Sequence, residues 1–280
     1  MADGQPDYRA ALLGEVLGTF VLVLFGLGAV HAAVLTGAMS GLWQVAAVWG
    51  LAVTFGIYVS AAVSGAHLNP AVTVAFAVWR GFSWAKVPGY VAAQLAGAAL
   101  AAWLLNVMYG GMIEAFHASA GIDPSSAGGA ATASMYGMYF PNPEGSAGWV
   151  DRWGLVSVWG ALLAELVGTA LLVGMVFCLT DTRERHAACV PAASGVPWAV
   201  GFTVAAIVCL VAPLTQAGLN PARDLGPRAV AFVAGWGETA FPGPRGGFWV
   251  YTVGPLLGGL VGAWVWERVS AWQGSAKVCE

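Results

Sequence analysis

The chain has 280 residues, of which 59% are hydrophobic and only 9% are charged, and its mean hydropathy is +0.74. A soluble domain carries about 25% charged residues, so this composition excludes an ordinary soluble protein and indicates an integral membrane protein. The net charge of −3 is too small to suggest a nucleic-acid partner. The first apolar run has no processing site, which predicts a retained span and not a cleaved leader.

Six apolar runs are long enough to cross a bilayer, which needs about 20 helical residues. They cover residues 10–34, 42–63, 87–109, 155–179, 196–213 and 247–267. Two shorter apolar stretches follow the second and the fifth run, at residues 68–79 and 219–233. Each of them would make a helix of about 15–20 Å at a rise of 1.5 Å per residue, which is half of a membrane.

The segment between the third and fourth runs, residues 110–154, is polar and rich in Gly and Ser. We expect an extramembrane loop there, with at most a short turn of helix. Lys and Arg collect on the cytoplasmic side of membrane proteins. If both chain ends share one side, that side receives Arg9, Arg80, Lys86, Arg183, Arg185, Arg268 and Lys277. This distribution predicts a protein of the cell membrane with cytoplasmic termini and an extracellular 110–154 loop.

The sequence repeats itself. Residues 15–19 read EVLGT and residues 165–169 read ELVGT, and each is followed by Asn-Pro-Ala at nearly the same distance. The two repeats cover about residues 8–109 and 155–270 within one domain that spans residues 1–280. Each repeat holds three spans, an odd number, so the repeats must have opposite orientations in the membrane. Inverted repeats with broken helices are typical of transport proteins, whose site lies at the midplane.

Two related motifs stand where the short apolar stretches begin, SGAHLNPAVT at residues 64–73 and QAGLNPARDLGPR at residues 216–228. Asn is a preferred N-cap and Pro is favoured at the next position. Each motif therefore starts a helix, at Asn69-Pro70-Ala71 and at Asn220-Pro221-Ala222. Irregular backbone at membrane depth is tolerated only where it is buried or lines a water-filled cavity. The inverted repeat predicts that the positive N-terminal ends of both half-helices meet near the centre.

With these motifs in register, the chain resembles the major intrinsic protein family, the aquaporins and aquaglyceroporins, over about residues 8–270. The resemblance implies an all-α membrane protein with six transmembrane helices and two re-entrant half-helices in a right-handed bundle. It implies a passive pore through each subunit of a homotetramer, without a cofactor or a metal. The amides of Asn69 and Asn220 would donate hydrogen bonds to water or hydroxyl groups that pass in single file.

Arg223 is an unusual residue for the first turn of a half-helix. A cation there opposes the helix dipole at about 0.3–1 kcal/mol, and a charge at bilayer depth costs about 2.5–3.5 kcal/mol on insertion scales. A purely structural helix would avoid both costs, although an ion pair with Asp224 is an alternative. The resemblance implies that Arg223 belongs to a selectivity filter with Trp49, Val208 and Ala217, in which it donates to the solute and repels cations.

The resemblance also favours the glycerol-conducting branch of the family. The positions that indicate this branch are Tyr109, Asp224, Arg228, Pro255 and Leu256. The ring of Trp49 can pack against the carbon backbone of a polyol, unless it is an interfacial residue that faces lipid. Val208 and Ala217 depart from the pattern, because glycerol channels usually have Gly and a second aromatic residue there. Glycerol with water is favoured, and water alone, urea, other small polyols or neutral metalloid hydroxides remain alternatives.

The remaining polar residues of the spans are Glu15, Glu165 and His67. We expect the two carboxylates to accept hydrogen bonds from the backbone of the re-entrant loops, and His67 to brace its loop with some contact to the pore. A proton relay in a coupled transporter is the alternative for the carboxylates. The spans hold no catalytic constellation, so an enzyme is not expected. Four cysteines are expected to be free thiols: Cys178, Cys189, Cys209 and Cys279.

Overall fold

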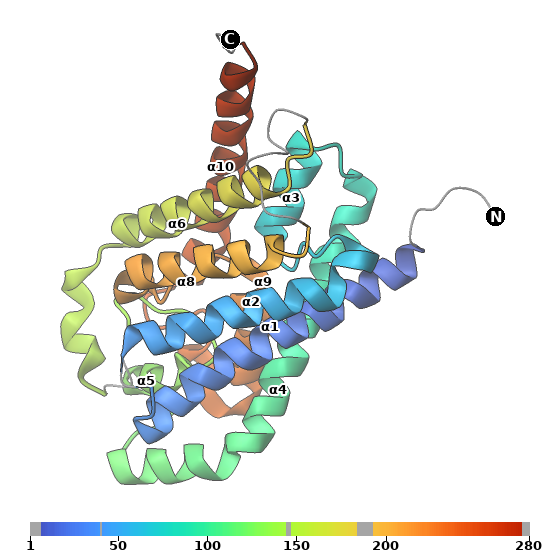
Figure 1. Ribbon diagram of the computed structural model, residues 1–280. Coiled ribbons are helices and arrows are strands. Elements are labelled where there is room, and N and C mark those ends of the chain that lie inside the picture. The colour runs from blue at the N-terminus through green and yellow to red at the C-terminus, as the bar shows by residue number, and fades with distance from the viewer. Residues whose placement is uncertain (1–6, 40, 144–146, 184–192, 276–280) are drawn as a thin grey trace.

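The computed structural model describes residues 7–39, 41–143, 147–183 and 193–275, and this part of the chain contains helices and no β-strand (Figure 1). Six helices are long and apolar enough to cross a membrane. They are α1 (Tyr8–Thr36), α2 (Leu42–Ser64), α4 (Val87–Ala120), α6 (Val158–Leu179), α8 (Val196–Thr215) and α10 (Val250–Ser275). Two short helices, α3 (Pro70–Trp79) and α9 (Pro221–Ala231), stand at the two Asn-Pro-Ala motifs. The predicted fold class of six spans and two half-helices is confirmed.

The helix ends follow from local sequence chemistry. The side chain of Asp7 accepts a hydrogen bond from the backbone N–H of Arg9 at the start of α1, and Ser157 caps α6 through the N–H of Gly160. At the other ends, Gly37, Gly65 and Gly121 close α1, α2 and α4 in the left-handed conformation, which glycine adopts without strain. Caps of this kind satisfy backbone groups that lipid cannot solvate.

The helix contacts are arranged alike in the two halves. Helix α1 packs against α2 and α4, α6 packs against α8 and α10, and α2 meets α8 between the halves. Each half-helix packs against the last long helix of the other half, α9 against α4 and α3 against α10. Two glycines at matching positions allow the close approaches. A Cβ atom on Gly97 would lie 2.3 Å from the carbonyl oxygen of Val16, and one on Gly258 would lie 2.2 Å from that of Leu166.

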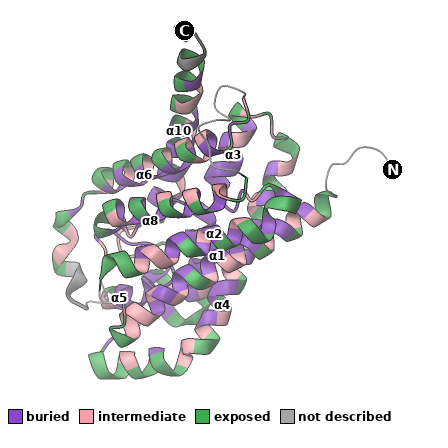
Figure 2. Ribbon diagram, viewed as in Figure 1, coloured by how far each residue is buried: buried purple, intermediate pink, exposed green. Residues whose placement is uncertain are grey.

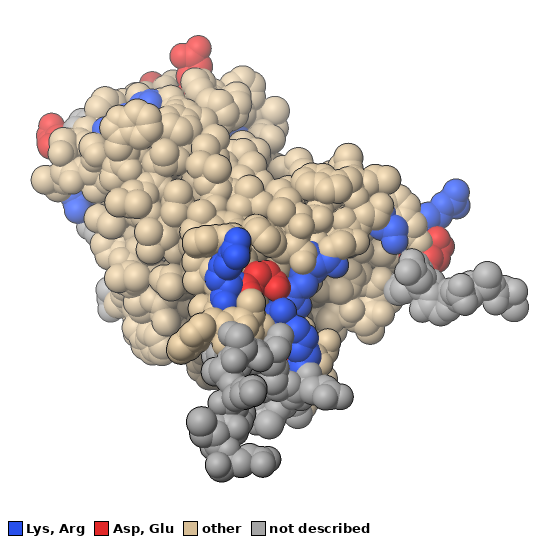
Figure 3. All heavy atoms as spheres, turned by 90° about the horizontal axis from the view of Figure 1, so that it is seen from above, with Lys and Arg blue, Asp and Glu red and all other residues tan. Residues whose placement is uncertain are grey.

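The outer surface is suited to hydrocarbon. Large apolar side chains are exposed on every long helix, for example Leu13, Phe202 and Trp103. Figure 2 shows exposed residues along the outward faces of the helices and buried residues between them. In Figure 3 most of the visible face carries no charge, and the Lys, Arg, Asp and Glu side chains gather in a few places. Such a surface would be unstable in water, and a bilayer solvates it.

The third span and the segment after it differ from the prediction. Helix α4 does not end at residue 109 but continues to Ala120, and its C-terminal part changes direction (Figure 1). The chain has Gly110 and Gly111 where the predicted span ends, and glycine pairs are common sites of helix bending. The following segment forms the short helices η2 (Ala127–Gly129), α5 (Ala130–Ala133) and η3 (Ala147–Leu155). Residues 130–141 are buried and not solvated as expected of a loop.

The other short elements precede the long helices α4 and α10 or follow the half-helix α9. They are η1 (Trp84–Lys86), η4 (Phe232–Trp236), η5 (Gly237–Thr239) and η6 (Gly247–Trp249). Four residues that the sequence analysis names lie outside the described residues: Arg185, Cys189, Lys277 and Cys279.

Candidate functional site: a channel with one constriction

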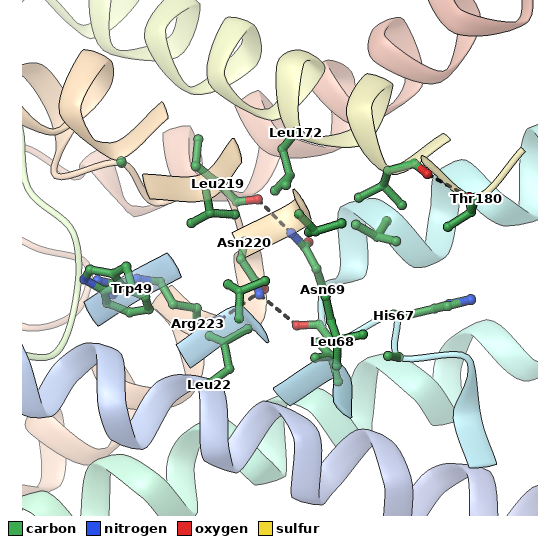
Figure 4. Close-up of a pocket in the computed structure, with 18 of the residues that line it drawn as sticks. Leu22, Trp49, His67, Leu68, Asn69, Leu172, Thr180, Leu219, Asn220 and Arg223 are labelled. Carbon is green, nitrogen blue, oxygen red and sulfur yellow. Dashed lines mark hydrogen bonds between the residues drawn. The ribbon is translucent and has the colours of Figure 1, made fainter. Parts of the chain in front are cut away.

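The N-termini of the two half-helices meet inside the helix bundle (Figure 4). Asn69 caps α3, and its side-chain nitrogen donates to the carbonyl oxygen of Leu219 at 2.9 Å. Asn220 caps α9 in the same way, and its side-chain nitrogen donates to the carbonyl oxygen of Leu68 at 2.8 Å. Each Asn therefore starts its own half-helix and binds the loop that leads into the other one.

These contacts leave one donor of each amide for another partner. A side-chain amide nitrogen carries two N–H groups, and the crossing bond to the opposite loop uses one of them. Both Asn69 and Asn220 line the same internal cavity. The prolines and alanines that follow them, Pro70, Ala71, Pro221 and Ala222, are buried. Their compact side chains allow the two helix ends to approach each other.

Glu15 holds the loop in front of α3. One of its oxygens accepts from the backbone N–H of His67 at 2.9 Å, and the other accepts from that of Leu68 at 2.7 Å. The second oxygen also accepts from the side chain of Gln94 at 2.7 Å. The carboxylate is completely buried, and these donors compensate for the loss of water. They also hold Leu68 at a φ of 53°, a left-handed conformation that disfavours residues with a side chain.

Glu165 makes the matching contacts in the second half. It accepts from the backbone N–H groups of Gly218 at 2.9 Å and Leu219 at 2.7 Å, and from the Thr215 hydroxyl at 2.6 Å. Leu219 has a φ of 55°, so the strained backbone recurs at the equivalent place. The two carboxylates are thus engaged with loop donors on both sides of the half-helix junction.

Two cavities adjoin each other inside the bundle, and three residues line both of them. The inner cavity has a volume of about 130 Å³ and contains the two Asn side chains, and the outer cavity has a volume of about 460 Å³. Trp49, Val208 and Arg223 border both cavities, and Ala217 borders the inner one. The structure therefore places three of the four predicted filter residues at the boundary that the two cavities share, which we call the constriction, and Ala217 on the wall of the inner cavity.

Arg223 is held at this constriction by two contacts. Its guanidinium carbon lies 4.4 Å from the centre of the Trp49 ring, and one of its nitrogens donates to the carbonyl oxygen of Tyr136 at 3.3 Å. Only 3% of the residue is exposed. The alternative role for Arg223, an ion pair with Asp224, is not what the structure has. Asp224 instead pairs with Arg228, at 2.8 Å from its Nε.

The Asp224–Arg228 pair fastens the buried 130–141 segment to α9. Asp224 accepts from the backbone N–H of Met138, and Arg228 donates to the carbonyl oxygens of Met138 and, at 2.7 Å, Ala240. Arg228 is 1% exposed and lies within α9, so it is not a loop residue. The pair acts on the constriction indirectly, because Tyr136 of the same segment binds Arg223.

The five positions associated with the glycerol branch do not border the channel. Among the described residues that line the two channel cavities, none is Tyr109, Asp224, Arg228, Pro255 or Leu256. The ring of Tyr109 lies 5.2 Å from that of His31, and Pro255 lies inside α10. These residues can affect the solute only through the packing of the elements that carry the wall.

The inner cavity is lined mostly by apolar side chains, with a few polar groups among them (Figure 4). Its apolar lining includes Leu22, Val53, Ile57, Val72, Leu172, Val176, Val200 and Val204. Its polar side chains include the Asn pair, Arg223 at one end, and His67 and Thr180 toward the other (Figure 4). The ring of His67 contacts the Thr73 hydroxyl at 3.2 Å and stacks on Phe76 at 4.9 Å between ring centres. His67 thus joins its loop to α3 and also borders the cavity.

Sequence reasoning missed two residues that support the constriction. Tyr136 provides the carbonyl group for Arg223, and Gln216 binds the backbone of Tyr139 at 2.9 Å and of Ser134 at 3.2 Å. Tyr136 belongs to no motif, and Gln216 opens the second Asn-Pro-Ala motif without any sign of the backbone that it binds. The aromatic run MYGMYF at residues 135–140 is the one sign in the sequence that this segment is buried.

Comparisons with known proteins agree with this geometry. Residues 4–266 match the protein family described as Major intrinsic protein. The chain is 38% identical over 260 residues to the glycerol uptake facilitator protein of Pseudomonas aeruginosa, covering 92% of this chain and 88% of the relative. It is 36% identical over 261 residues to the propanediol uptake facilitator of Citrobacter freundii, covering 92% of this chain and 91% of that relative. The X-ray structure of the aquaglyceroporin from Plasmodium falciparum superposes with a TM-score of 0.81 at 29% identity, covering 96% of this chain and all of the other. The chain is a multi-pass membrane protein and belongs to the major intrinsic protein family.

Proposed function

We propose that the protein is a passive channel for glycerol and related small uncharged solutes, that it also conducts water, and that it excludes ions and protons. The observation that carries the proposal is the constriction between the two cavities, where Arg223 lies over the ring of Trp49. A buried cation and an aromatic face there make a slot with one hydrogen-bonding side and one apolar side.

A polyol fits such a slot better than an ion does. Its hydroxyl groups can accept from the guanidinium of Arg223 and then from the remaining N–H groups of Asn69 and Asn220. Its carbon atoms can pack against Trp49 and Val208, so neither side of the solute loses its contacts. The printed names of the relatives, facilitators of glycerol and propanediol uptake, support a solute of this chemical class.

Cations meet unfavourable charge at two points. Arg223 carries a positive charge at the constriction, and the N-terminal ends of α3 and α9 point into the inner cavity with the positive ends of their dipoles. This is the arrangement by which aquaporin-type pores in general exclude cations and protons. An uncharged solute passes both points without this penalty.

The choice among uncharged solutes depends on the wall opposite Arg223. Val208 and Ala217 border the inner cavity with small side chains, which leaves room for a carbon chain. We assign the selection of the glycerol class to Trp49, Val208, Ala217 and Arg223 together. Tyr109, Asp224, Arg228, Pro255 and Leu256 act on the solute only through the packing of the elements that carry these four residues.

The surroundings of the channel follow from the same proposal. One domain of residues 1–280, with repeats at 8–109 and 155–270, crosses the cell membrane with both termini in the cytoplasm, and residues between the repeats lie outside. The protein assembles as a homotetramer with one pore per subunit. Exposed apolar side chains on the outer helix faces can meet lipid or another subunit.

Stopped-flow light scattering of proteoliposomes tests the proposal, with a glycerol gradient and an impermeant sucrose gradient run side by side. Rapid reswelling in glycerol, absent from empty liposomes and unaffected by a pH or sodium gradient, is the expected result. Sucrose-driven shrinkage without glycerol entry would show a water-selective pore. Flux coupled to a proton or sodium gradient would show a secondary transporter. Parallel urea and boric acid gradients separate the polyol channel from a urea or metalloid channel.

A further inference from the structure

The indole ring of Trp49 lies directly against the backbone of α1 at Gly26. A Cβ atom on Gly26 would lie 2.2 Å from Cζ3 of the indole and 2.4 Å from both Cε3 and Cη2. Carbon atoms that are not bonded pack at about 3.5–4.0 Å. No side chain at position 26 is therefore compatible with the present place of the ring.

Moving the ring would change the constriction itself. Trp49 borders both cavities, and the Arg223 guanidinium lies over its ring at 4.4 Å. Helix α1 blocks any movement toward Gly26. The open space beside the indole is the passage between the cavities, so a group added at Gly26 displaces the ring toward the solute path or tilts it away from Arg223.

The second repeat has no aromatic ring at the position equivalent to Trp49 and no glycine at the position equivalent to Gly26. Counted from the repeated Glu-x-x-Gly-Thr motif, Val176 in α6 corresponds to Gly26 in α1. Gly50 and Gly201 face each other where α2 and α8 cross, and the residues before them, Trp49 and Val200, correspond in the same way. Val176 and Val200 both border the inner cavity. The second repeat therefore has Val176 and Val200 at the two positions that Gly26 and Trp49 hold in the first repeat.

We infer that Gly26 is a positioning residue: its missing side chain leaves the space in which the Trp49 indole lies, and this sets the width of the constriction. The inference rests on the proposed channel function. Gly26 touches no solute, and it acts through Trp49. The position of the indole among the filter residues then depends on a pair of residues on two helices, and a methyl group on α1 is enough to alter it.

The experiment compares Gly26→Ala with two other variants in proteoliposomes, and the measured quantity is the ratio of glycerol to water permeability. Gly28→Ala is the matched control, because its Cβ would lie 3.6 Å from the nearest side-chain atom, Cδ2 of Leu105. We expect Gly26→Ala to lower the ratio at least about tenfold, as expected of overpacking at a tight contact, and Gly28→Ala to leave it unchanged. Gly26→Ala combined with Trp49→Phe should restore the ratio to that of Trp49→Phe alone, since phenylalanine lacks the second ring that meets the methyl group.

A merely structural role of Gly26 would lower the amount of folded protein and both permeabilities together, with an unchanged ratio. That result, or a ratio in the double variant as low as in Gly26→Ala, would overturn the inference. If Gly26→Ala does not fold, the double variant Gly26→Ala with Trp49→Phe is the test. It should fold and have the same permeability ratio as Trp49→Phe, and if the double variant does not fold either, the inference is overturned. If the unmodified protein conducts no glycerol, the proposed function fails, and the Gly26 inference is then tested on water permeability alone.

Discussion

Asn69 donates a hydrogen bond of 2.9 Å to the carbonyl oxygen of Leu219, a residue 150 positions further along the chain. Asn220 returns a bond of 2.8 Å to the carbonyl oxygen of Leu68. Each half-helix is therefore capped by a residue that also holds the opposite loop. The same side chain caps the start of its half-helix and has a second N–H group beside the cavity. In the proposed channel, capping, loop closure and solute binding would therefore depend on one amide.

The variant Asn69→Asp separates capping from donation. An aspartate keeps the oxygen that caps α3, since Asp and Asn are about equally good N-caps, but its carboxylate cannot donate to the carbonyl oxygen of Leu219. A buried carbonyl without its donor costs about 1–3 kcal/mol. We expect a folded protein whose glycerol permeability falls at least about tenfold, measured by stopped-flow reswelling. Asn220→Asp should behave alike, and unchanged glycerol flux in both variants would contradict the proposed role.

Replacing Arg223 by lysine separates charge from geometry. Lysine keeps the positive charge but lacks the planar set of donors with which arginine can bind Tyr136 and a hydroxyl group at the same time. Arg223→Lys should therefore still exclude protons while conducting less glycerol. Arg223→Val should lose glycerol selectivity and also admit a proton leak.

The two properties are read from the same liposomes, glycerol entry by light scattering and proton entry by a trapped pH-sensitive dye. Proton leakage in Arg223→Lys equal to that in Arg223→Val would show that charge at this position is not what excludes cations.

Much of the site could be predicted from sequence because its signals are local and occur twice. Asn-Pro at a helix start fixes a cap, and the regular distances from Glu15 and Glu165 to these caps place the carboxylates beside the loops. Those loops accordingly donate to the two carboxylates at 2.7–2.9 Å. The six spans could be predicted for a similar reason, since a bilayer demands long apolar helices.

The segment after the third span could not be predicted, because its burial depends on residues far along the chain. Asp224 and Arg228 bind the backbone of Met138, and the aromatic run at residues 135–140 indicates burial without indicating these partners. Asp224 and Arg228 are four residues apart, which suits an ion pair on one helix face, but the spacing does not tell what the pair binds. The contact of Gly26 with Trp49 is likewise a property of two packed helices and leaves no trace in either helix alone.

Removing one member of the buried pair should destabilise the protein strongly. Asp224→Ala leaves the guanidinium of Arg228, which is 1% exposed, without its carboxylate. Such a loss costs about 3–5 kcal/mol, or a fall of roughly 5–10 °C in thermal midpoint for a chain of this size. Thermal unfolding in detergent measures it.

Asp224→Asn is the matched control, because its amide oxygen can still accept hydrogen bonds from Met138 and Arg228. Its thermal midpoint should fall less than that of Asp224→Ala. Adding Arg228→Leu to Asp224→Ala removes the unpaired charge, so the double variant should lose less than the sum of the two single variants. Strictly additive losses would show that the pair does not act as a unit.

An aromatic residue at position 217 should make the channel more selective for water. Ala217 borders the inner cavity near the constriction, so the ring of Ala217→Phe would fill space that a carbon chain needs. We expect the ratio of glycerol to water permeability to fall at least about tenfold. Ala217→Ser, which is close in volume, should keep the ratio, and a rise of glycerol flux in Ala217→Phe would show that the solute binds the aromatic wall instead.

The ion pair between Asp181 and Arg183, which follows α6 in the chain, should stabilise the protein over the whole physiological pH range. The Asp181 carboxylate accepts from the Arg183 side chain and, at 3.0 Å, from the indole N–H of Trp266. Burial opposes its ionisation, but the hydrogen bond from Arg183 and the other donors outweigh burial and hold the pKa of Asp181 well below its usual range.

A carboxyl group with a lowered pKa adds stability that is fully present above its unfolded-state pKa of about 3.9, and this stability is lost as the pH falls toward the folded-state value. The difference in thermal midpoint between the unmodified protein and Asp181→Asn should therefore stay constant from about pH 8 to pH 5 and shrink only below about pH 4. A difference that already disappears near pH 6 would contradict the role assigned to Asp181.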